Sequence, residues 1–316
     1  VPADAPECVQ AQRLQVSYPV ARPGWRGWFG HDARVVVDAV DLSLRSAQTL
    51  AVIGESGSGK SVTLRSILKL HPEHRTRWSG SIKLEGDEVL GMKGAQLADL
   101  RGRRVAMIFQ EPATAFDPVF TIGQQISETV RRHTGKSDSE AWKRAKDLLE
   151  MVRIPSPAQR LKAYPHEMSG GMRQRAMIAM ALVCRPALLI ADEPTTALDV
   201  TTQAEILKLV AELQASQGTG VLFITHDFGV VAEIADRVAV MQHGRIVEEG
   251  RAADVLERPQ HPYTAKLIAA IPDMEAGAGR AARAAPRDSV LDVEGLTKSY
   301  TLGGGLFRAP RTVAAV

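Results

Sequence analysis

The sequence predicts an α/β protein built on a mainly parallel sheet. Short apolar runs of strand length alternate with longer amphipathic segments, which is the pattern of strands joined by helices that pack on the faces of a sheet. The apolar run 49–53 leads directly into a glycine-rich loop, and residues 62–70 then have helical character before Pro72. This order of strand, loop and helix is typical of a phosphate-binding sheet.

The remaining strands are predicted from short apolar runs bounded by turn residues. Residues 81–84 alternate in polarity, as an edge strand does. Core strands are predicted at residues 105–109, 187–191 and 221–225. Residues 237–249 are expected to form two strands joined by a hairpin turn at His243 and Gly244.

The chain changes character between residues 111 and 168. No strong strand pattern occurs there, and the segment 141–152 has a clear helical periodicity. Its apolar face consists of Ala145, Leu148, Leu149 and Val152. We therefore expect a separate helical subdomain inserted at about residues 111–168.

The composition is that of a soluble globular protein with room for about two domains. The 316 residues are 45% hydrophobic and 24% charged, and the formal net charge is only +3. This modest charge gives no strong field that would attract nucleic acid, which is not expected as a partner. The apolar stretches 177–184 and 187–191 are shorter than the roughly 20 residues that cross a bilayer, so no membrane-spanning helix is predicted.

The cysteines and the first residues indicate the compartment. Cys8 and Cys184 lie far apart, which predicts no disulfide framework, zinc ribbon or iron–sulfur cluster and favours a reducing cytosol. Residues 1–7 lack the basic start and the apolar core of a secretory signal. Because residue 1 is Val rather than Met, we expect the native start to have been trimmed.

The end of the chain is predicted to hold a linker and the start of a repeat. Residues 276–288 are rich in Ala, Gly and Arg and are expected to be the linker. Beyond it, residues 293–300 resemble residues 11–18, and residues 313–316 resemble residues 37–40. Short alternating strands can look alike by chance. The favoured interpretation is a second copy of the domain, residues 289–316, inside which this chain stops.

Nucleotide phosphates are expected to bind in the glycine-rich loop. Its residues are Gly54, Glu55, Ser56, Gly57, Ser58, Gly59, Lys60 and Ser61. The glycines let backbone N–H groups curl around phosphate oxygens, and Lys60 adds a positive charge. The following helix points the positive end of its dipole at the phosphates, while the Ser61 hydroxyl can coordinate magnesium. A glycine-rich turn without a ligand is the alternative, but the complete pattern favours bound Mg-ATP.

A pair of acids ends another predicted strand. Residues 188–191 are apolar and run into Asp192 and Glu193, which places both carboxylates at the carboxyl edge of the sheet beside the phosphates. Asp192 can hold magnesium through water, and Glu193 can polarise the attacking water. His226 follows the strand 221–225 at the same edge, where a lone histidine is more often structural.

A second anion site is predicted at Ser169, Gly170 and Gly171, which open an apolar helix that extends to Cys184. Such a turn preceding the acidic strand resembles the ATP-binding-cassette (ABC) ATPases, and the resemblance covers most of residues 9–250. It implies a P-loop NTPase core with an antiparallel β subdomain and an inserted α-helical subdomain. A P-loop kinase would leave the Ser-Gly-Gly segment unexplained.

The resemblance also implies a role for each motif. Residues 54–61 match the Walker A loop, residues 188–192 the Walker B strand, residues 169–172 the signature and residues 197–199 the D-loop. In the same terms, Tyr18 is the aromatic residue that stacks on adenine, Gln110 the Q-loop glutamine that senses the nucleotide and reaches the metal, Glu193 the catalytic glutamate and His226 the switch histidine. Met172 departs from the family pattern, in which many members have Gln.

The mechanism implied by the resemblance needs two cassettes that meet head to tail. Each ATP would lie between the Walker A loop of one cassette and the signature of the other. Glu193 would orient water for in-line attack on the γ-phosphate, while His226 and Lys60 stabilise the developing charge.

Three further segments are similar to the oligopeptide and dipeptide importer branch of this family. They are residues 164–167 before the signature, residues 111–118 after Gln110, and residues 258–264, whose His-Pro-Tyr sequence begins an extension that we place at residues 258–275. The cysteine cluster of some members is absent from this extension, so an iron–sulfur site is not supported.

This branch implies an assembly on the cytoplasmic face of a bacterial inner membrane. Its parts are two cassettes, two membrane-spanning permease subunits and an extracytoplasmic solute-binding protein. The cargo could be peptides, glutathione, nickel or a peptide-like antibiotic, and no residue chooses among them. The alternative is a non-transport ABC ATPase that acts on DNA or the ribosome. The low net charge and the His-Pro-Tyr segment count against that alternative.

Overall fold

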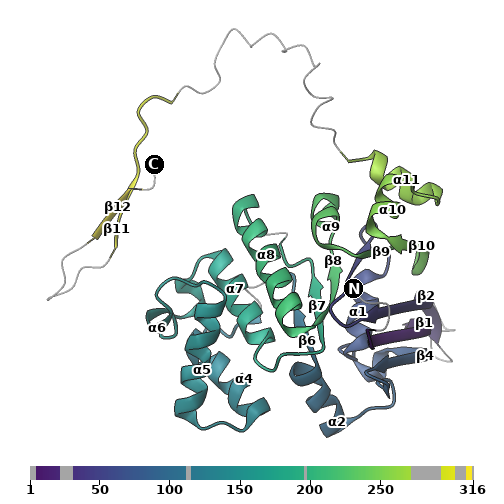
Figure 1. The fold of residues 1–316 in the computed structure, drawn as a ribbon, viewed down its shortest axis with the longest axis horizontal. Helices are drawn as coiled ribbons and strands as arrows, with labels where there is room; N and C mark the ends of the chain where they lie inside the picture. Colours follow the sequence, from purple (N-terminus) through teal and green to yellow (C-terminus); the bar gives the residue numbers. More distant parts are fainter. Residues whose placement is uncertain are drawn as a thin grey trace. The chain divides into compact units, whose positions relative to one another are not determined.

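The computed structural model describes residues 5–21, 31–111, 115–195, 198–271, 293–302 and 311–314. The chain divides into two compact units, residues 1–271 and residues 272–316, and each is described by itself. The first unit contains both large sheets and all the described helices (Figure 1).

The central sheet has six strands in the order β10-β9-β3-β8-β7-β6. The four strands that carry the site are β3 (Thr49–Ile53), β6 (Val105–Ile108), β7 (Leu188–Asp192) and β8 (Gly220–Ile224). Neighbouring members of this set pair in parallel, and β3, β7 and β8 are buried along their whole length. Continuous apolar runs are typical of parallel strands that are covered on both faces. The α/β prediction and these strand positions are confirmed.

Two further strands close one side of this sheet. Strand β9 (Arg237–Gln242) runs parallel to β3, and β10 (Arg245–Arg251) pairs antiparallel with β9. The turn between them has positive φ at both His243 (48°) and Gly244 (80°), as a tight two-residue hairpin requires. The predicted hairpin is therefore confirmed.

Helices cover the parallel sheet on both faces, as Figure 1 shows. They are α1 (Lys60–Ile67), α7 (Gly170–Ala181), α8 (Val200–Gln217), α9 (Phe228–Ile234), α10 (Ala252–Glu257) and α11 (Pro262–Ala269). Helix α1 ends earlier than predicted. Lys69 adopts a φ of 47°, and this left-handed conformation cannot continue a right-handed helix.

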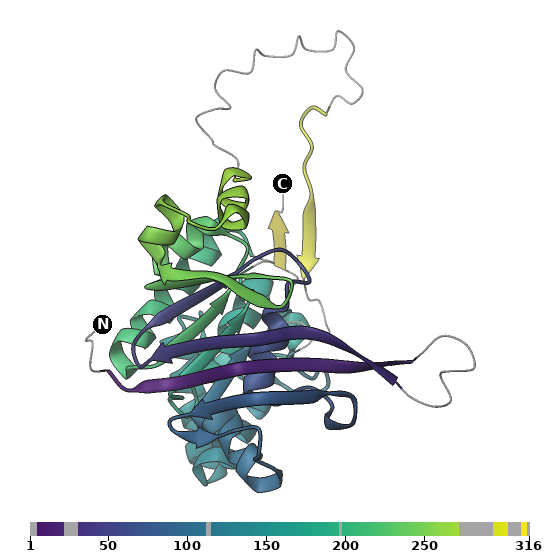
Figure 2. The same cartoon turned by 90° about the vertical axis from the view of Figure 1, so that its right-hand side faces the viewer.

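A second, antiparallel sheet packs near α1 and has the order β2-β1-β4-β5. Its long strands are β1 (Glu7–Ala21), β2 (His31–Arg45) and β4 (Arg77–Leu84), and β5 (Asp87–Glu88) is short (Figure 2). The prediction of an edge strand at 81–84 was wrong, because β4 lies between β1 and β5. Its alternation arises because Ile82 and Leu84 face the core while the intervening Lys83 is exposed.

The helical subdomain gathers apart from the antiparallel sheet (Figure 1). Its elements are α4 (Ile122–Thr134), α5 (Asp138–Met151), α6 (Pro157–Arg160) and the short turn η4 (Pro165–Glu167). Helices α4 and α5 each begin with a capping box, which satisfies free N–H groups of the first turn. The predicted apolar face is buried completely, with Ala145, Leu148, Leu149 and Val152 all 0% exposed. Outside this subdomain, the first unit also contains the short helices α2 (Gly94–Asp99), η2 (Glu73–Arg75) and η3 (Leu100–Arg104).

The second unit contains one antiparallel pair among its described residues. Strand β11 (Ser299–Leu302) pairs with β12 (Arg311–Ala314), and Tyr300 lies opposite Val313. The predicted linker at 276–288 lies outside the described residues.

In the described part of the chain, every helix is too short or too polar to span a membrane.

Candidate active site

The phosphate loop follows β3, where the fold forces a conformation that only glycine adopts easily. Gly54 has a φ of 147°, and a Cβ atom built on it would lie 2.2 Å from the carbonyl oxygen of Met241. The turn between β9 and β10 holds the far side of the loop, because the Gly244 N–H donates to the Ser58 carbonyl oxygen at 2.8 Å. The curled loop backbone is thus fixed by its neighbours before any ligand binds.

Lys60 lies inside the loop, as predicted for the phosphate-binding lysine. Its Nζ donates to the carbonyl oxygens of Gly54 (2.7 Å) and Glu55 (2.9 Å), and the residue is 7% exposed. Burial lowers the pKa of Lys60, while the nearby carboxylates of Glu193 and Asp192 act in the opposite direction. The two predicted acids therefore lie within electrostatic reach of the loop.

Ser61 and Asp192, two of the three residues predicted to lie at the magnesium ion, are in direct contact. The Ser61 hydroxyl donates to Asp192 Oδ1 at 2.9 Å, and Asp192 is 1% exposed at the end of β7. Arg65 Nη2 pairs with Asp192 Oδ2 at 3.2 Å. Sequence reasoning missed Arg65, although its position four residues after Ser61 on one helix places both on the same face.

Glu193 lies between two of the other predicted residues. Gln110 Nε2, which follows β6, donates to Glu193 Oε2 at 2.9 Å. His226 Nδ1, which follows β8, lies 3.6 Å from Glu193 Oε1. Because β6, β7 and β8 are adjacent and parallel, the residues after their carboxyl ends meet at one edge of the sheet.

The backbone of Glu193 is strained. Its φ of 47° lies in the left-handed region, which a non-glycine residue rarely adopts. Its N–H donates to the Ile224 carbonyl oxygen at 3.1 Å, which ties the strained residue to the neighbouring strand β8. Strain of this kind concentrates at functional sites, where the surrounding structure holds it.

Tyr18, predicted to stack on adenine, contacts a histidine that sequence reasoning did not select. Its hydroxyl lies 3.2 Å from His71 Nδ1, and His71 Nε2 lies 3.1 Å from the Val62 carbonyl oxygen. Since a carbonyl only accepts, Nε2 carries the proton and Nδ1 accepts from Tyr18. Burial raises the pKa of Tyr18 and lowers that of His71. Adenine stacking stays a prediction.

The signature segment, residues 169–172, lies at the start of helix α7 and is separate from the hydrogen bonds that hold the phosphate loop. Ser169 caps the helix by accepting from the Met172 N–H at 3.3 Å. A Cβ atom on Gly171 would lie 2.7 Å from the Thr202 methyl group, so this glycine lets α7 and α8 approach closely. Among the described residues, no hydrogen bond joins Ser169, Gly170 or Gly171 to the loop.

The predicted D-loop, residues 197–199, is described only in part. Ala197 lies outside the described residues. Asp199 caps α8, since its Oδ1 accepts from the Thr202 N–H at 2.9 Å.

Comparison with protein families matches this nucleotide site to a known group. The family described as "ABC transporter" matches residues 37–196, which include the phosphate loop, Gln110, the signature and the Asp192–Glu193 pair. The chain belongs to the ABC transporter family. It is an ATP-binding cassette with ATPase activity, as the sequence motifs predicted. A second family, "Oligopeptide/dipeptide transporter, C-terminal region", matches residues 247–300 of this ABC cassette.

Curated relatives of this ABC cassette are named for peptide transport and glutathione import. It is 52% identical over 239 residues to the "Probable peptide ABC transporter ATP-binding protein y4tR" of Sinorhizobium fredii, covering 75% of this chain and 71% of that protein. It is 46% identical over 327 residues to the "Glutathione import ATP-binding protein GsiA" of Salmonella typhimurium, covering 91% of this chain. The chain spans 51% of the length of this GsiA protein.

Solved structures show the same cassette fold. The dimeric, post-hydrolysis structure of the ATP-binding cassette MJ0796, bound to ADP and Pi, has a TM-score of 0.66 and 26% identity. That similarity covers 77% of this ABC chain and 98% of MJ0796. The predicted P-loop NTPase core, with its antiparallel β subdomain and inserted helices, is confirmed.

Proposed function

We propose that this chain is the ATP-hydrolysing subunit of an importer for peptides or peptide-like solutes. The observation that carries the proposal is the meeting of Lys60, Ser61, Asp192 and Glu193 at one sheet edge, in a chain whose C-terminal region matches the oligopeptide/dipeptide family. The y4tR and GsiA relatives are named for peptides and glutathione, which are chemically related cargoes.

The proposed chemistry is in-line attack of water on the γ-phosphate of ATP. Glu193 orients the water, because Gln110 holds one of its carboxylate oxygens and leaves the other facing His226 at 3.6 Å. Lys60 and the loop N–H groups stabilise the charge that develops on the phosphate oxygens. His226, whose side chain is 64% exposed, is free to approach the γ-phosphate from the same side.

Magnesium fits the oxygen atoms at this site. Ser61 Oγ and the Asp192 carboxylate are hard oxygen donors of the kind that Mg²⁺ prefers, and they lie in contact at 2.9 Å. When bound, the ion would neutralise charge on the β- and γ-phosphates. Gln110 is proposed as a further magnesium ligand, although its amide nitrogen donates a hydrogen bond to Glu193.

A second cassette is proposed to complete the ATP site. The signature at Ser169 has no hydrogen bond to the loop within the described residues, and the MJ0796 cassette is dimeric. We propose that residues 289–316 begin such a cassette, because β11 and β12 form an antiparallel pair that overlaps the resembling segments at residues 299–300 and 313–314. The registers differ, since Tyr18 faces Arg34 and Tyr300 faces Val313. A native gene without a second phosphate loop beyond residue 316 would contradict this proposal.

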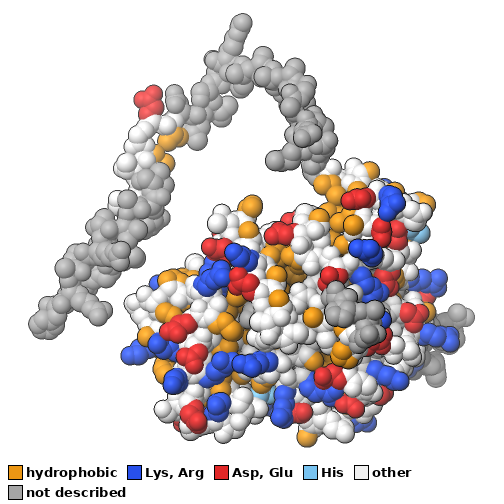
Figure 3. All heavy atoms as spheres, in the orientation of Figure 1, with side chains coloured by type: hydrophobic (Ala, Val, Ile, Leu, Met, Phe, Trp, Pro, Cys, Tyr) orange, Lys and Arg blue, Asp and Glu red, His pale blue; other side chains and the backbone are white. Residues whose placement is uncertain are grey.

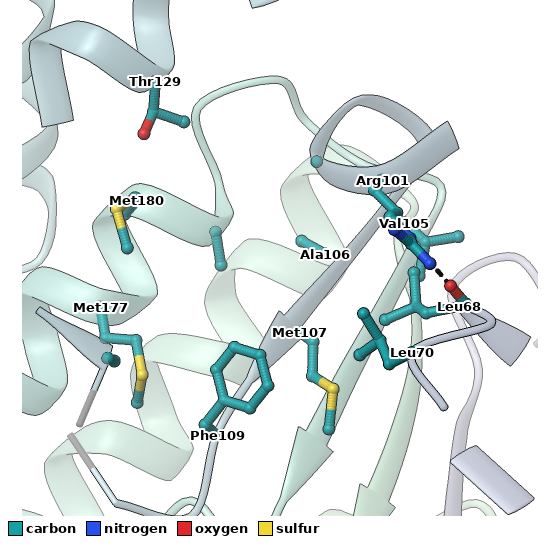
Figure 4. Close-up of a pocket in the computed structure, with 13 residues that line it drawn as sticks. Leu68, Leu70, Arg101, Val105, Ala106, Met107, Phe109, Thr129, Met177 and Met180 are labelled. Atoms are coloured by element: carbon teal, nitrogen blue, oxygen red, sulfur yellow. Dashed lines mark hydrogen bonds between the residues drawn. The ribbon is translucent and has the colours of Figure 1, made fainter. Parts of the chain in front are cut away.

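The permease subunits are proposed to dock on an apolar groove beside the site. A pocket of about 250 Å³ lies between β6, helix α7 and the end of α1 (Figure 4). Phe109 and Leu70 are 40% and 39% exposed there, and Met177 and Met180 line it from α7. Phe109 precedes Gln110, so a permease loop in the groove could act on the residue that holds Glu193.

The proposed assembly places this chain on the cytoplasmic face of a bacterial inner membrane. Two permease subunits would span the membrane, and an extracytoplasmic binding protein would deliver the solute. The alternative, an ABC ATPase that acts on DNA or the ribosome, would need a basic surface. On the face shown in Figure 3, Lys and Arg side chains are interspersed with Asp and Glu, which gives little support to that alternative.

The decisive experiment reconstitutes the native-length protein with its permease subunits and binding protein in liposomes. We expect dipeptides or oligopeptides to stimulate ATP hydrolysis several-fold and to accumulate inside. Glutathione and nickel are the comparison cargoes. Stimulation by DNA or ribosomes, with no response to any solute, would contradict the importer function.

A further inference from the structure

The C-terminal extension reaches the phosphate loop through one tyrosine. The Tyr263 hydroxyl oxygen accepts a hydrogen bond from the Glu55 backbone N–H at 3.0 Å. Glu55 is the second residue of the loop, and its N–H shares a peptide group with the Gly54 carbonyl oxygen, which accepts from Lys60 Nζ at 2.7 Å. A contact between segments 208 residues apart in the sequence therefore acts on the peptide that also holds the phosphate-binding lysine.

The ring of Tyr263 is anchored in the strand that leads into the loop. Tyr263 is 8% exposed and belongs to a small core cluster with Ala51 and Ile53 of β3. The same cluster includes Ala252 and Val255 of α10, so it packs both α10 and Tyr263 of the extension against the parallel sheet. This packing sets the ring in place and leaves the hydroxyl at the start of the loop.

The backbone around Tyr263 is also fixed. Both carboxylate oxygens of Glu248 on β10 are engaged, since they accept from the N–H groups of Gln260 (2.8 Å) and His261 (3.0 Å). His261 Nδ1 accepts from the Tyr263 N–H at 3.2 Å and so caps α11, in which Pro262 is the first residue. The His-Pro-Tyr sequence thus has a structural role for each residue: a cap, a helix start and a contact to the loop.

We propose that Tyr263 is a positioning residue for ATP binding and that it couples the C-terminal extension to the phosphate loop. The loop is held from two sides, by Gly244 at Ser58 and by Tyr263 at Glu55. Without the Tyr263 hydroxyl, the first half of the loop loses its fixed acceptor and must be ordered by the nucleotide itself. Nucleotide affinity then falls by the free energy of that ordering.

The first test uses the Tyr263→Phe substitution, which removes the hydroxyl and keeps the ring in its cluster. Titration calorimetry with MgADP on the full chain should show a roughly 2- to 10-fold higher Kd, the loss expected for one neutral hydrogen bond. The matched control is Tyr164→Phe, at a tyrosine that is 39% exposed and lies in the helical subdomain. An unchanged Kd in Tyr263→Phe, or an equal rise in the control, would overturn the proposal.

The second test measures the coupling itself. Because coupling is reciprocal, MgADP should slow hydrogen exchange of the amides in α11, and Tyr263→Phe should remove most of this protection. Equal protection of α11 by MgADP in both proteins would overturn the proposal, as would a loss of unfolding stability with no change in either readout. The inference rests on the ATP site of the proposed function. A wild-type chain that failed to bind MgADP would overturn both, whereas an unaffected variant would overturn only the role of Tyr263.

Discussion

Gln110 Nε2 donates a hydrogen bond to Glu193 Oε2 at 2.9 Å, and this contact joins the ends of two adjacent strands. Gln110 also follows Phe109, which lines the apolar groove proposed for the permease. A displacement of the segment after β6 would therefore move the hydrogen-bond partner of Glu193, the proposed catalytic glutamate. The contact offers a direct route by which permease binding could alter ATP hydrolysis.

Replacing Glu193 by Gln should separate binding from turnover. The neutral amide keeps the shape of the side chain but no longer polarises the attacking water. We expect ATP affinity to be retained while phosphate release falls about 10²- to 10⁴-fold, measured at steady state with the assembled transporter. Glu212→Gln, at an exposed residue of α8 that pairs with Arg153, is the control and should hydrolyse ATP normally. Normal turnover in Glu193→Gln would show that another group orients the water.

Replacing Gln110 by Ala should lower kcat more than it changes nucleotide affinity. The variant removes a hydrogen bond to a charged group, which is typically worth about 1.5–3 kcal/mol, so we expect a fall in kcat of about tenfold or more. Parallel measurements of kcat and of the Kd for MgADP make the comparison. A rise in Kd with unchanged kcat would place Gln110 in binding instead.

The two glycines Gly54 and Gly57 should respond differently to substitution by Ala. A Cβ atom at Gly54 would meet the Met241 carbonyl oxygen at 2.2 Å, whereas nothing lies within 4 Å of a Cβ atom at Gly57. Both have positive φ, so Gly57→Ala carries the backbone strain alone, about 1–2 kcal/mol. We expect nucleotide binding to be abolished in Gly54→Ala and only weakened in Gly57→Ala. Equal effects on the Kd for MgADP would show that the clash is relieved.

The Arg65–Asp192 pair should contribute modestly to stability. Arg65→Gln leaves the buried Asp192 carboxylate with the Ser61 hydroxyl and the nearby charge of Lys60 but without its ion-pair partner. Because the Arg65 side chain is 43% exposed and partly screened, we expect the free energy of unfolding to fall by only about 1 kcal/mol. Urea unfolding measures this change as a lower midpoint with an unchanged slope. The exposed Arg153–Glu212 pair is the comparison. Arg153→Gln should lower the free energy of unfolding by less than Arg65→Gln does.

His71 should make stability depend on pH. Burial holds the pKa of folded His71 below the ordinary histidine value of 6.5, so the unfolded chain binds more protons just below that value. The contribution of neutral, buried His71 to the free energy of unfolding is complete above pH 6.5 and is lost as the pH falls towards the pKa of His71 in the folded chain. The stability difference between wild type and His71→Gln should therefore shrink on acidification from about pH 8 to about pH 5. A constant difference in unfolding midpoint over this range would contradict the assignment.

The sequence by itself determined the nucleotide loop, the core strands of the parallel sheet and the family. Residues 54–61, the acidic end of β7 and the signature are local patterns whose chemistry depends on residue type and spacing. The buried face of α5 and the hairpin at His243 and Gly244 were also predictable, because helical periodicity and turn residues act over short stretches.

Only the tertiary structure decided which residues from distant segments meet. The pairing of Gln110 with Glu193, the salt bridge of Arg65 with Asp192 and the Tyr263 contact to Glu55 depend on strand order and helix packing. The position of β4 inside its sheet also depends on pairing that a single alternating strand does not encode. Local patterns fix the chemistry that each segment can offer. Long-range packing decides which residues those chemical groups contact, because burial and hydrogen-bond satisfaction are properties of the assembled fold.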